Sequence, residues 1–347
     1  MSSIAIIGAG VSALAAAHIL QDAGYAVTLF EQEHNAGGRA TTRKREGFIY
    51  DTGAQYIKQG APESVSWITE RFRTPDLIDI TKPVWIFDGE GHIQEGDPVM
   101  NAEPKWCYRN GLCMLAKKMA EGLDIRLETH IAHVQQTRLG WNLYAAPDQL
   151  IRSFEHLLIT IPAPEASTLI QASHFTQDIR AHICTYLDTT RYNSLISVAL
   201  GYKPRPTSRP YYALVNTDKQ HPISWLAWEH EKSPERTPTD AGLLIAQMAP
   251  QYSAEHWQVP DADLIPEVTE RVKTLIDEDL PFPIFTDVQR WPYALPSTKA
   301  DADELNAMTL PQGLAFCGDA FVGGRVHLAL EHGIRVAQQF INHSNSG

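Results

Sequence analysis

Three small residues near the start of the chain have the spacing that dinucleotide binding requires. Gly8, Gly10 and Ala13 follow the apolar run at residues 4–7 and stand at the three small positions of the dinucleotide-binding fingerprint. Gly8 would permit the tight turn, Gly10 would let the backbone approach a pyrophosphate, and Ala13 would keep helix and strand close. The N–H groups at the start of the following helix would receive the phosphate charge.

A carboxylate follows at the place where a ribose would lie. Residues 25–31 (YAVTLFE) are typical of a second strand, and this strand ends in Glu31. A carboxylate about twenty residues beyond the glycines accepts hydrogen bonds from a ribose hydroxyl. A strand–helix turn that binds no nucleotide would explain the glycines but not Glu31, so the sequence indicates a bound dinucleotide.

A second glycine turn comes soon after this acid. Gly37, Gly38 and Arg39 are more than a nicotinamide-only domain needs. Backbone N–H groups beside a guanidinium can support the far phosphate of a longer cofactor.

A further glycine turn that could contact the cofactor lies near the C-terminus. Gly318 and Asp319 follow an apolar strand at residues 314–317, and a helix begins near Gly324. Asp319 could accept a hydrogen bond from ribityl hydroxyls, and the helix would direct its positive end at a ring system that gains negative charge on reduction. Gly318-Asp319 alone would be an ordinary turn, but together with the second glycine turn it favours FAD over NAD.

The elements that must position these residues are those of an α/β protein. Short apolar runs at residues 4–7, 156–161 and 314–317 suit strands buried on both faces, and residues 326–341 have helical spacing. Between them, Pro-rich loops separate alternating segments, which indicates a second domain. The expected division is an FAD-binding domain of residues 1–75, 105–165 and 313–347, and a substrate domain of residues 76–104 and 166–312.

The composition describes an ordinary globular protein. Of 347 residues 44% are hydrophobic and 20% charged, and the formal net charge of −12 argues against nucleic acid as a partner. The four cysteines lie far apart without metal-ligand spacing, so we expect reduced thiols and no metal site. No stretch is long and apolar enough to span a membrane, and no leader precedes the first strand, so we expect a cytoplasmic protein without a membrane partner.

The sequence resembles the FAD-dependent amine oxidase superfamily, and within it the renalase-like branch. The resemblance depends on IAIIGAGVSALAAA, the GGR of residues 37–39, DTGAQYI at 51–57, RWPYALP at 290–296 and GLAFCGDAFVGGRV at 313–326. It implies a glutathione-reductase-like fold, in which a discontinuous Rossmann-type FAD-binding domain carries a second α+β substrate domain with a mixed or antiparallel sheet.

The resemblance also implies which residues contact the cofactor. Val134 would meet the adenine through its backbone, and Tyr56 and Trp291 would lie at the substrate side of the isoalloxazine. The full set expected at FAD is Gly8, Gly10, Val11, Ser12, Ala13, Glu31, Gln32, Gly37, Gly38, Arg39, Gly53, Ala54, Gln55, Tyr56, Val134, Gly318, Asp319, Gly324, Arg325 and Val326.

Two polar positions depart from the pattern of this branch. Renalase-like proteins commonly place an asparagine and a histidine on two strands that face the flavin. The asparagine position falls near His230, and the histidine position falls at Ala246, beside Gln247. The candidate catalytic residues are therefore Tyr56, Trp291, His230 and Gln247, although a satisfied, non-catalytic histidine is the simpler interpretation of His230.

Two tryptophans in one alternating run have different expected environments. Trp225 and Trp228 are three residues apart, so they cannot both face the substrate, and at least one is expected in the core.

The expected function is oxidation of a small organic donor. Renalase-like relatives pass a hydride from dihydronicotinamide isomers to flavin N5 and electrons to dioxygen, which gives hydrogen peroxide. The alternatives are a flavin amine oxidase, a desaturase and an FAD-binding protein without turnover. Amine oxidases carry a tyrosine pair near the C-terminal motif, where Ala320, Phe321 and Val322 stand here, and a desaturase would need a membrane-binding helix that the hydropathy does not support.

Overall fold

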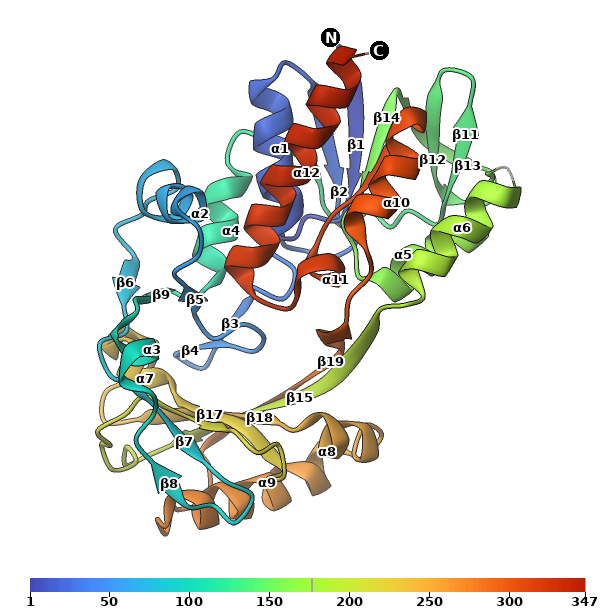
Figure 1. Cartoon of the computed structure of the whole chain (residues 1–347). Coiled ribbons are helices and arrows are strands. Elements are labelled where there is room, and N and C mark those ends of the chain that lie inside the picture. Colours follow the sequence, from blue (N-terminus) through green and yellow to red (C-terminus); the bar gives the residue numbers. More distant parts are fainter. Residues whose placement is uncertain (176, 347) are drawn as a thin grey trace.

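A parallel sheet joins both ends of the chain. The computed structural model describes residues 1–175 and 177–346. Within them, five parallel strands have the order β10-β2-β1-β14-β20. Figure 1 labels the three middle strands, β2, β1 and β14. These strands are β1 (Ser3–Ile7), β2 (Ala26–Phe30), β10 (Asp124–Arg126), β14 (His156–Ile159) and β20 (Leu314–Phe316). The expected apolar strands at residues 4–7, 156–161 and 314–317 are thus confirmed as neighbours in one Rossmann-type sheet.

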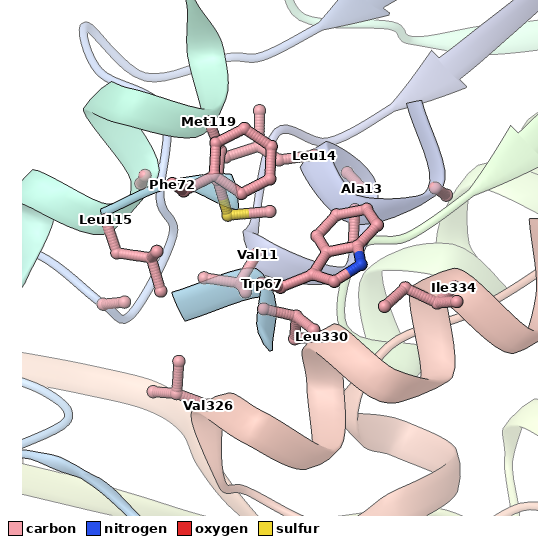
Figure 2. Packing of buried hydrophobic residues seen from close by; sticks show 14 of the residues in the cluster. Val11, Ala13, Leu14, Trp67, Phe72, Leu115, Met119, Val326, Leu330 and Ile334 are labelled. Carbon is pink, nitrogen blue, oxygen red and sulfur yellow. The ribbon is translucent and has the colours of Figure 1, made fainter. Parts of the chain in front are cut away.

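Helices from both ends of the chain cover one face of this sheet. Figure 2 shows Leu14, Trp67 and Leu330 in the apolar cluster that they share. A Cβ on Gly333 would collide with the carbonyl of Ser12, so the glycine lets the last helix cross close to the first. The elements on this face are α1 (Val11–Asp22), α2 (Pro62–Ser66), the π-helix η1 (Trp67–Arg71), α4 (Cys113–Ala120) and α12 (Val326–Ser346).

The other face of the parallel sheet carries elements that we expected partly in the substrate domain. Leu169, Ile183 and Leu305 share a buried cluster with Ile7 and Phe316 of the sheet. The elements on this face are α5 (Ala163–Ala172), α6 (Gln177–Leu187), α10 (Ala302–Thr309) and the meander β11 (His133–Thr137), β12 (Gly140–Ala146) and β13 (Gln149–Phe154). The domain boundaries stay a prediction, and this packing favours placing 166–187 and 302–309 with the FAD-binding part.

A second sheet of seven strands forms the opposite end of the molecule (Figure 1). Only β16 and β7 run parallel, so the sheet is mixed, as expected. Its outer face buries Val198, Leu226 and Leu244 with Val268 of α9. The strands, in spatial order, are β19 (Phe285–Thr298), β15 (Arg191–Tyr202), β18 (Gly242–Met248), β17 (Ile223–Trp228), β16 (Ala213–Asn216), β7 (Val84–Phe87) and β8 (Ile93–Gln94), with α8 (Pro250–Glu255) and α9 (Asp261–Ile276).

Short elements connect the two sheets. Phe48 and Tyr50 of one hairpin pack with Leu243 and Phe285 on the inner face of the seven-stranded sheet. The Tyr50 hydroxyl also donates to Asp287 on β19 (2.8 Å). The connecting elements are β3 (Thr42–Arg45), β4 (Phe48–Asp51), β5 (Ile57–Lys58), β6 (Leu77–Asp79), α3 (Pro98–Ala102), β9 (Lys105–Tyr108), α7 (Glu229–Lys232), η2 (Pro234–Arg236) and α11 (Asp319–Val322). The short η3 (Leu310–Gln312) joins α10 to β20 beside the parallel sheet.

The described residues contain neither a membrane-spanning helix nor a metal-binding cluster. None of their helices combines the length and the apolar character that a membrane crossing requires. The same residues hold no group of three or more His, Cys, Asp or Glu side chains arranged to bind a metal ion.

Candidate functional site

The two glycine turns meet where the sequence predicts the pyrophosphate. Gly8 has a φ of +99°, and its N–H donates to the carbonyl of Phe30 (2.8 Å). Gly10 forms a bridge with Gly37, whose N–H donates to the carbonyl of Ala9 (2.8 Å). A Cβ on Gly10 would meet no atom within 4 Å. The backbone therefore borders open space at the start of α1, which fits a phosphate group.

Glu31 organises this turn from the end of β2. One carboxylate oxygen accepts the N–H of Ala9 (2.8 Å), and the other accepts the N–H of Glu33 (3.0 Å). Burial raises the pKa of Glu31, and these backbone hydrogen bonds oppose the shift. A carboxylate has about four lone-pair sites, so Glu31 keeps acceptor capacity for a ribose hydroxyl.

Four further residues predicted to bind FAD lie close by: three in the first turn of α1, and one next to Glu31 in the sequence. Val11, Ser12 and Ala13 are buried in the first turn of α1. Gln32 lies 3.3 Å from the ring nitrogen Nδ1 of His130, measured from its Oε1.

Both backbone groups of Val134, which we expected at the adenine, have hydrogen-bond partners within the chain. Its N–H donates to Ser173 Oγ (2.9 Å), and its carbonyl accepts the N–H of His174 (2.9 Å). Three residues earlier, Ile131 is 6% exposed, and its backbone N–H and C=O have no hydrogen-bond partner within the described residues. Buried backbone groups are normally paired, so Ile131 is the better candidate for the edge of an adenine.

Arg39 and Asp319 form a bidentate ion pair. The two terminal nitrogens of Arg39 lie 2.7 and 2.8 Å from the two carboxylate oxygens of Asp319. Arg39 also donates to the carbonyl of Tyr293 on β19 (2.7 Å), and its own carbonyl accepts the N–H of Ala54 (3.1 Å). The Tyr192 hydroxyl donates to Asp319 (3.0 Å). Burial raises the pKa of Tyr192, and the Asp319 carboxylate is the second cause of this shift. We expected Arg39 to support a phosphate, but its guanidinium instead joins the second glycine turn to the C-terminal Gly-Asp turn and to β19.

The loop after β4 turns its carbonyl groups toward the seven-stranded sheet. Trp291 Nε1 donates to the carbonyl of Thr52 (3.0 Å), and Gln247 Nε2 donates to the carbonyl of Gly53 (2.7 Å). In a trans peptide the N–H points away from the C=O, so the N–H of Gly53 faces the opposite side from Trp291. Neither this N–H nor the buried Thr52 Oγ1 has a partner within residues 1–175 and 177–346. These unpaired groups suit the polar edge of a bound planar ring.

Gln247 stands in a row of side chains on the inner face of the seven-stranded sheet. The strand register places it opposite Ser197 on β15 and Trp225 on β17. Trp225 stacks on Tyr56 with ring centroids 6.0 Å apart. Trp225 Nε1 and Ser197 Oγ are buried without a partner in the described part of the chain. The structure thus brings Tyr56, Gln247 and Trp291 to one loop and adds Ser197 and Trp225.

The pleat of the sheet explains which neighbours face away. Ala246 and Trp228 are fully buried in the cluster on the outer face. The expectation that Trp225 and Trp228 have different environments is therefore confirmed, and Gln247, not Ala246, faces the loop. The alternation of side chains along a strand could also have placed Ser197 on one face of the sheet. Alternation alone does not show which face is functional.

His230 does not belong to this group. It lies in α7, is 5% exposed, and its Nδ1 accepts the N–H of Leu243 (3.1 Å). Leu243 precedes Gln247 by four residues on β18, so His230 lies near the far end of that strand. Burial lowers the pKa of His230 to about 4, so the ring is neutral near pH 7. The structure therefore separates His230 from the loop that Gln247 and Trp291 contact, which favours the simpler interpretation of a satisfied, non-catalytic histidine.

A second buried histidine has the same character. His332 is 1% exposed, its Nδ1 accepts the N–H of Gly318 (3.1 Å), and burial lowers its pKa to about 4. The unfolded pKa is about 6.5, so the unfolded chain binds more protons between about pH 6.5 and 4. Stability should therefore fall as the pH drops through that window, by about 2 kcal/mol for each histidine at pH 5.

Urea unfolding at neutral pH and at about pH 5 measures this effect. In His230→Asn, the Asn oxygen can still accept the N–H of Leu243 but cannot be protonated near pH 5. This variant should recover about 2 kcal/mol of the stability that wild type loses. His34→Asn, on an exposed histidine, is the matched control and should recover none. An undiminished acid loss in His230→Asn would contradict the assignment.

The C-terminal motif lies against the end of β19. Gly323 has a φ of +105°, and a Cβ on Gly324 would collide with Leu295. Arg325 is exposed, and α12 begins at Val326, two residues later than expected. The close approach of Gly324 to β19 fixes where this helix starts relative to the second sheet.

Together these features define a class of protein. Two converging glycine turns, open space over Gly10, and unpaired donors at Thr52 and Gly53 fit the pyrophosphate and the ring of a flavin dinucleotide. A Rossmann-type sheet that faces a second, mixed sheet across such a site is typical of FAD-dependent oxidoreductases.

Comparison with protein families identifies the family. The flavin containing amine oxidoreductase model matches residues 79–341, and the NAD(P)-binding Rossmann-like domain model matches residues 6–69. The chain belongs to the flavin-containing amine oxidoreductase family, and its cofactor is FAD.

Individual relatives match only parts of the sequence. A 4,4'-diapophytoene desaturase from Staphylococcus haemolyticus (strain JCSC1435) is 37% identical over 87 residues, which are 24% of this chain and 17% of that protein. The desaturase of the same name from Staphylococcus aureus (strain Newman) is 50% identical over 54 residues, 16% of this chain and 11% of that protein. The chain thus spans less than a fifth of the length of these relatives.

Solved structures match along the whole chain. Cyclohexylamine oxidase from Brevibacterium oxydans IH-35A has a TM-score of 0.76 at 14% identity and covers 99% of both chains. Reduced UDP-galactopyranose mutase also has a TM-score of 0.76 at 14% identity, over 100% of this chain and 96% of that one. At this identity the likeness shows the fold alone, and it confirms the expected α/β architecture.

Proposed function

We propose that the protein is a cytoplasmic FAD-dependent oxidase that takes a hydride from a small planar donor of the dihydronicotinamide type. The aromatic surface of Tyr56 and Trp225, next to Gln247 and the loop at residues 52–56, carries this proposal. A planar ring can stack on such a surface. Because the amide nitrogen of Gln247 is bonded to Gly53, its Oε1 remains as an acceptor for a substrate N–H.

The residues of the chain have a positioning task in this reaction. The bound FAD supplies the hydride acceptor, N5, and dioxygen then takes two electrons and two protons to give hydrogen peroxide. Hydride transfer requires the donor carbon about 3–3.5 Å from its acceptor. It needs no general base, because the nicotinamide ring stabilises the positive charge that remains after the hydride leaves.

An amine donor is the second candidate. The faces of Tyr56 and Trp225 can attract a cationic substrate as well as a planar one. The family assignment supports this candidate without choosing between the two.

Anaerobic mixing of the FAD-loaded protein with 2- and 6-dihydro-NAD(P), and separately with small primary amines, tests both candidates. We expect a dihydronicotinamide to abolish the visible flavin absorbance. When air is admitted, the absorbance should recover and hydrogen peroxide should form. Bleaching by amines alone would support the second candidate. No bleaching by any donor would contradict both and indicate an FAD-binding protein without turnover.

Gln247→Leu should slow flavin reduction while the protein still binds FAD. The substitution removes the hydrogen bond to the Gly53 carbonyl and the free amide oxygen. The loss of about 1 kcal/mol of positioning energy corresponds to a reduction rate about fivefold slower. Stopped-flow absorbance measures the rate, and Gln251→Leu, at an exposed position of α8, is the matched control. A wild-type rate in Gln247→Leu would show that Gln247 has no part in substrate positioning.

A further inference from the structure

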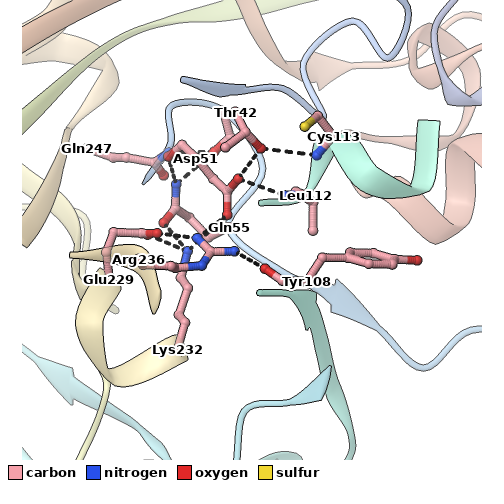
Figure 3. Close-up of polar contacts among 11 residues, drawn as sticks. Thr42, Asp51, Gln55, Tyr108, Leu112, Cys113, Glu229, Lys232, Arg236 and Gln247 are labelled. Atoms are coloured by element: carbon pink, nitrogen blue, oxygen red, sulfur yellow. Dashed lines mark hydrogen bonds and ion pairs between the residues drawn. The ribbon is translucent and has the colours of Figure 1, made fainter. Parts of the chain in front are cut away.

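Four charged side chains are buried together between the two sheets (Figure 3). Asp51, Glu229 and Arg236 are fully buried, and Lys232 is 4% exposed. Arg236 lies 2.7 Å from Asp51 and also contacts Glu229. Lys232 Nζ lies 2.5 Å from Glu229 and 3.5 Å from Asp51. Two carboxylates face two cations, so this charged cluster is neutral as a whole.

The charged cluster is tied to backbone on both sides. Arg236 donates to the carbonyl of Tyr108 (2.6 Å), and the second oxygen of Asp51 accepts the N–H of Leu112 (2.8 Å). Burial raises the pKa of Asp51, but Arg236 and other neighbours outweigh this effect and hold it below its usual value. Asp51 therefore stays ionised, and α7 and η2 are fixed against the end of β4.

Lys232 extends the charged cluster to a neutral amide. Its Nζ donates to Gln55 Oε1 (3.1 Å), and Gln55 Nε2 donates to the carbonyls of Asp51 (2.7 Å) and Gly53 (3.2 Å). An ammonium group has donors only, so it can face the oxygen of the amide but not the nitrogen. Lys232 thus fixes which way round the Gln55 amide lies, and the amide nitrogen must point at the two carbonyls.

The Gly53 carbonyl is where the charged cluster meets the substrate site. It accepts hydrogen bonds from Gln55 and also from Gln247 (2.7 Å). Gln247 lies on the second sheet and Gln55 on the loop itself, so the two amides together fix the orientation of the Gly53 carbonyl. A rotated Gln55 amide would place an oxygen against the carbonyls of Asp51 and Gly53, and the resulting repulsion would move the loop.

We propose that Lys232 is a positioning residue for FAD, which holds the loop at residues 52–56 in its binding conformation by orienting the Gln55 amide. The role goes beyond hydride transfer, because it concerns the cofactor and not the substrate. A buried ion pair is in general no more stabilising than apolar side chains of the same shape. The one contact of Lys232 that apolar packing could not supply is the directional hydrogen bond to Gln55.

Titration of the apoprotein with FAD, followed by flavin fluorescence and visible absorbance, tests the proposal without any substrate. Lys232→Met and Gln55→Met should each weaken FAD binding by about tenfold and shift the visible flavin band in the same direction. If Lys232 acts through Gln55, the double variant should bind FAD no more weakly than either single variant. Lys117→Met, on an exposed lysine of α4, should change neither affinity nor spectrum.

A second pair of variants tests the same role if Lys232→Met alone does not fold. Glu229→Gln with Lys232→Met leaves Asp51 and Arg236 as a balanced pair, and adding Gln55→Met to it should cause no further loss of affinity. Wild-type affinity in Lys232→Met would overturn the proposal. So would additive losses from Lys232 and Gln55, or a lowered melting temperature with unchanged affinity and spectrum, since these indicate a purely structural role.

Discussion

Replacing Gly10 with valine should leave a folded protein that no longer binds FAD. Gly10 has φ −70° and ψ 173°, which any residue can adopt, and a Cβ there would meet no protein atom within 4 Å. The stability loss should be about 1 kcal/mol, because valine is a poorer N-cap residue than glycine. A valine side chain would occupy the space that we assign to the pyrophosphate. FAD affinity should fall at least about a hundredfold, which is about 2.7 kcal/mol.

Gly37→Ala is the control for Gly10→Val, because it separates a loss of stability from a loss of FAD binding. Gly37 has φ +122°, and a Cβ there would lie 2.9 Å from the Cβ of Ala116. This variant should destabilise the apoprotein by more than Gly10→Val does. Thermal unfolding of the apoprotein and FAD titration separate the two effects. Retained FAD binding in Gly10→Val would show that the pyrophosphate lies elsewhere.

Replacing Arg236 with methionine should have the largest effect on stability. Arg236 is fully buried and is the strongest partner of Asp51, and it also contacts Glu229. Its removal leaves two buried carboxylates with Lys232 as the only cation of the charged cluster. Removing one partner of a buried ion pair costs about 3–5 kcal/mol. Urea unfolding followed by far-UV circular dichroism measures the loss.

Two variants control for this measurement. Arg271→Met breaks a half-exposed pair with Glu267 within α9 and should cost at most about 0.5 kcal/mol. Adding Glu229→Gln to Arg236→Met restores the balance of charge and should recover part of the stability. A cost for Arg236→Met as small as that for Arg271→Met would mean that the charged cluster is hydrated and not buried.

The parts of the fold that could be predicted from sequence are those fixed by local physics. Gly8 needs a positive φ, Gly10 needs an empty side-chain position, and Glu31 ends a strand whose partner begins at Ser3. All three requirements are met within the first strand–helix–strand unit, so the first turn and its acid could be placed without a structure. The α12 helix could be predicted for the same reason, because its apolar stripe repeats along its own length.

The structure departs from the sequence-based expectations where the placement of a residue depends on others far apart in the chain. Val134 and Ile131 are both apolar, and only their hydrogen bonds to the rest of the fold distinguish them. Ser197 faces Gln247 through strand register, which a single sequence does not specify. Asp51 and Arg236 are 185 residues apart, so no local pattern predicts their ion pair. Long-range pairing, rather than the chemistry of single residues, limited the prediction of the site.

Titration of the apoprotein with FAD, with FMN as the comparison, tests the central claim most directly. We propose that both ends of the chain together enclose one FAD. Its adenine half lies near Glu31, and its ring lies at the loop of residues 52–56. The predicted result is one FAD bound per chain, and much tighter than FMN, which lacks the adenylate half. A protein that is colourless when purified and takes up no FAD would contradict the account, as would equal affinity for FMN.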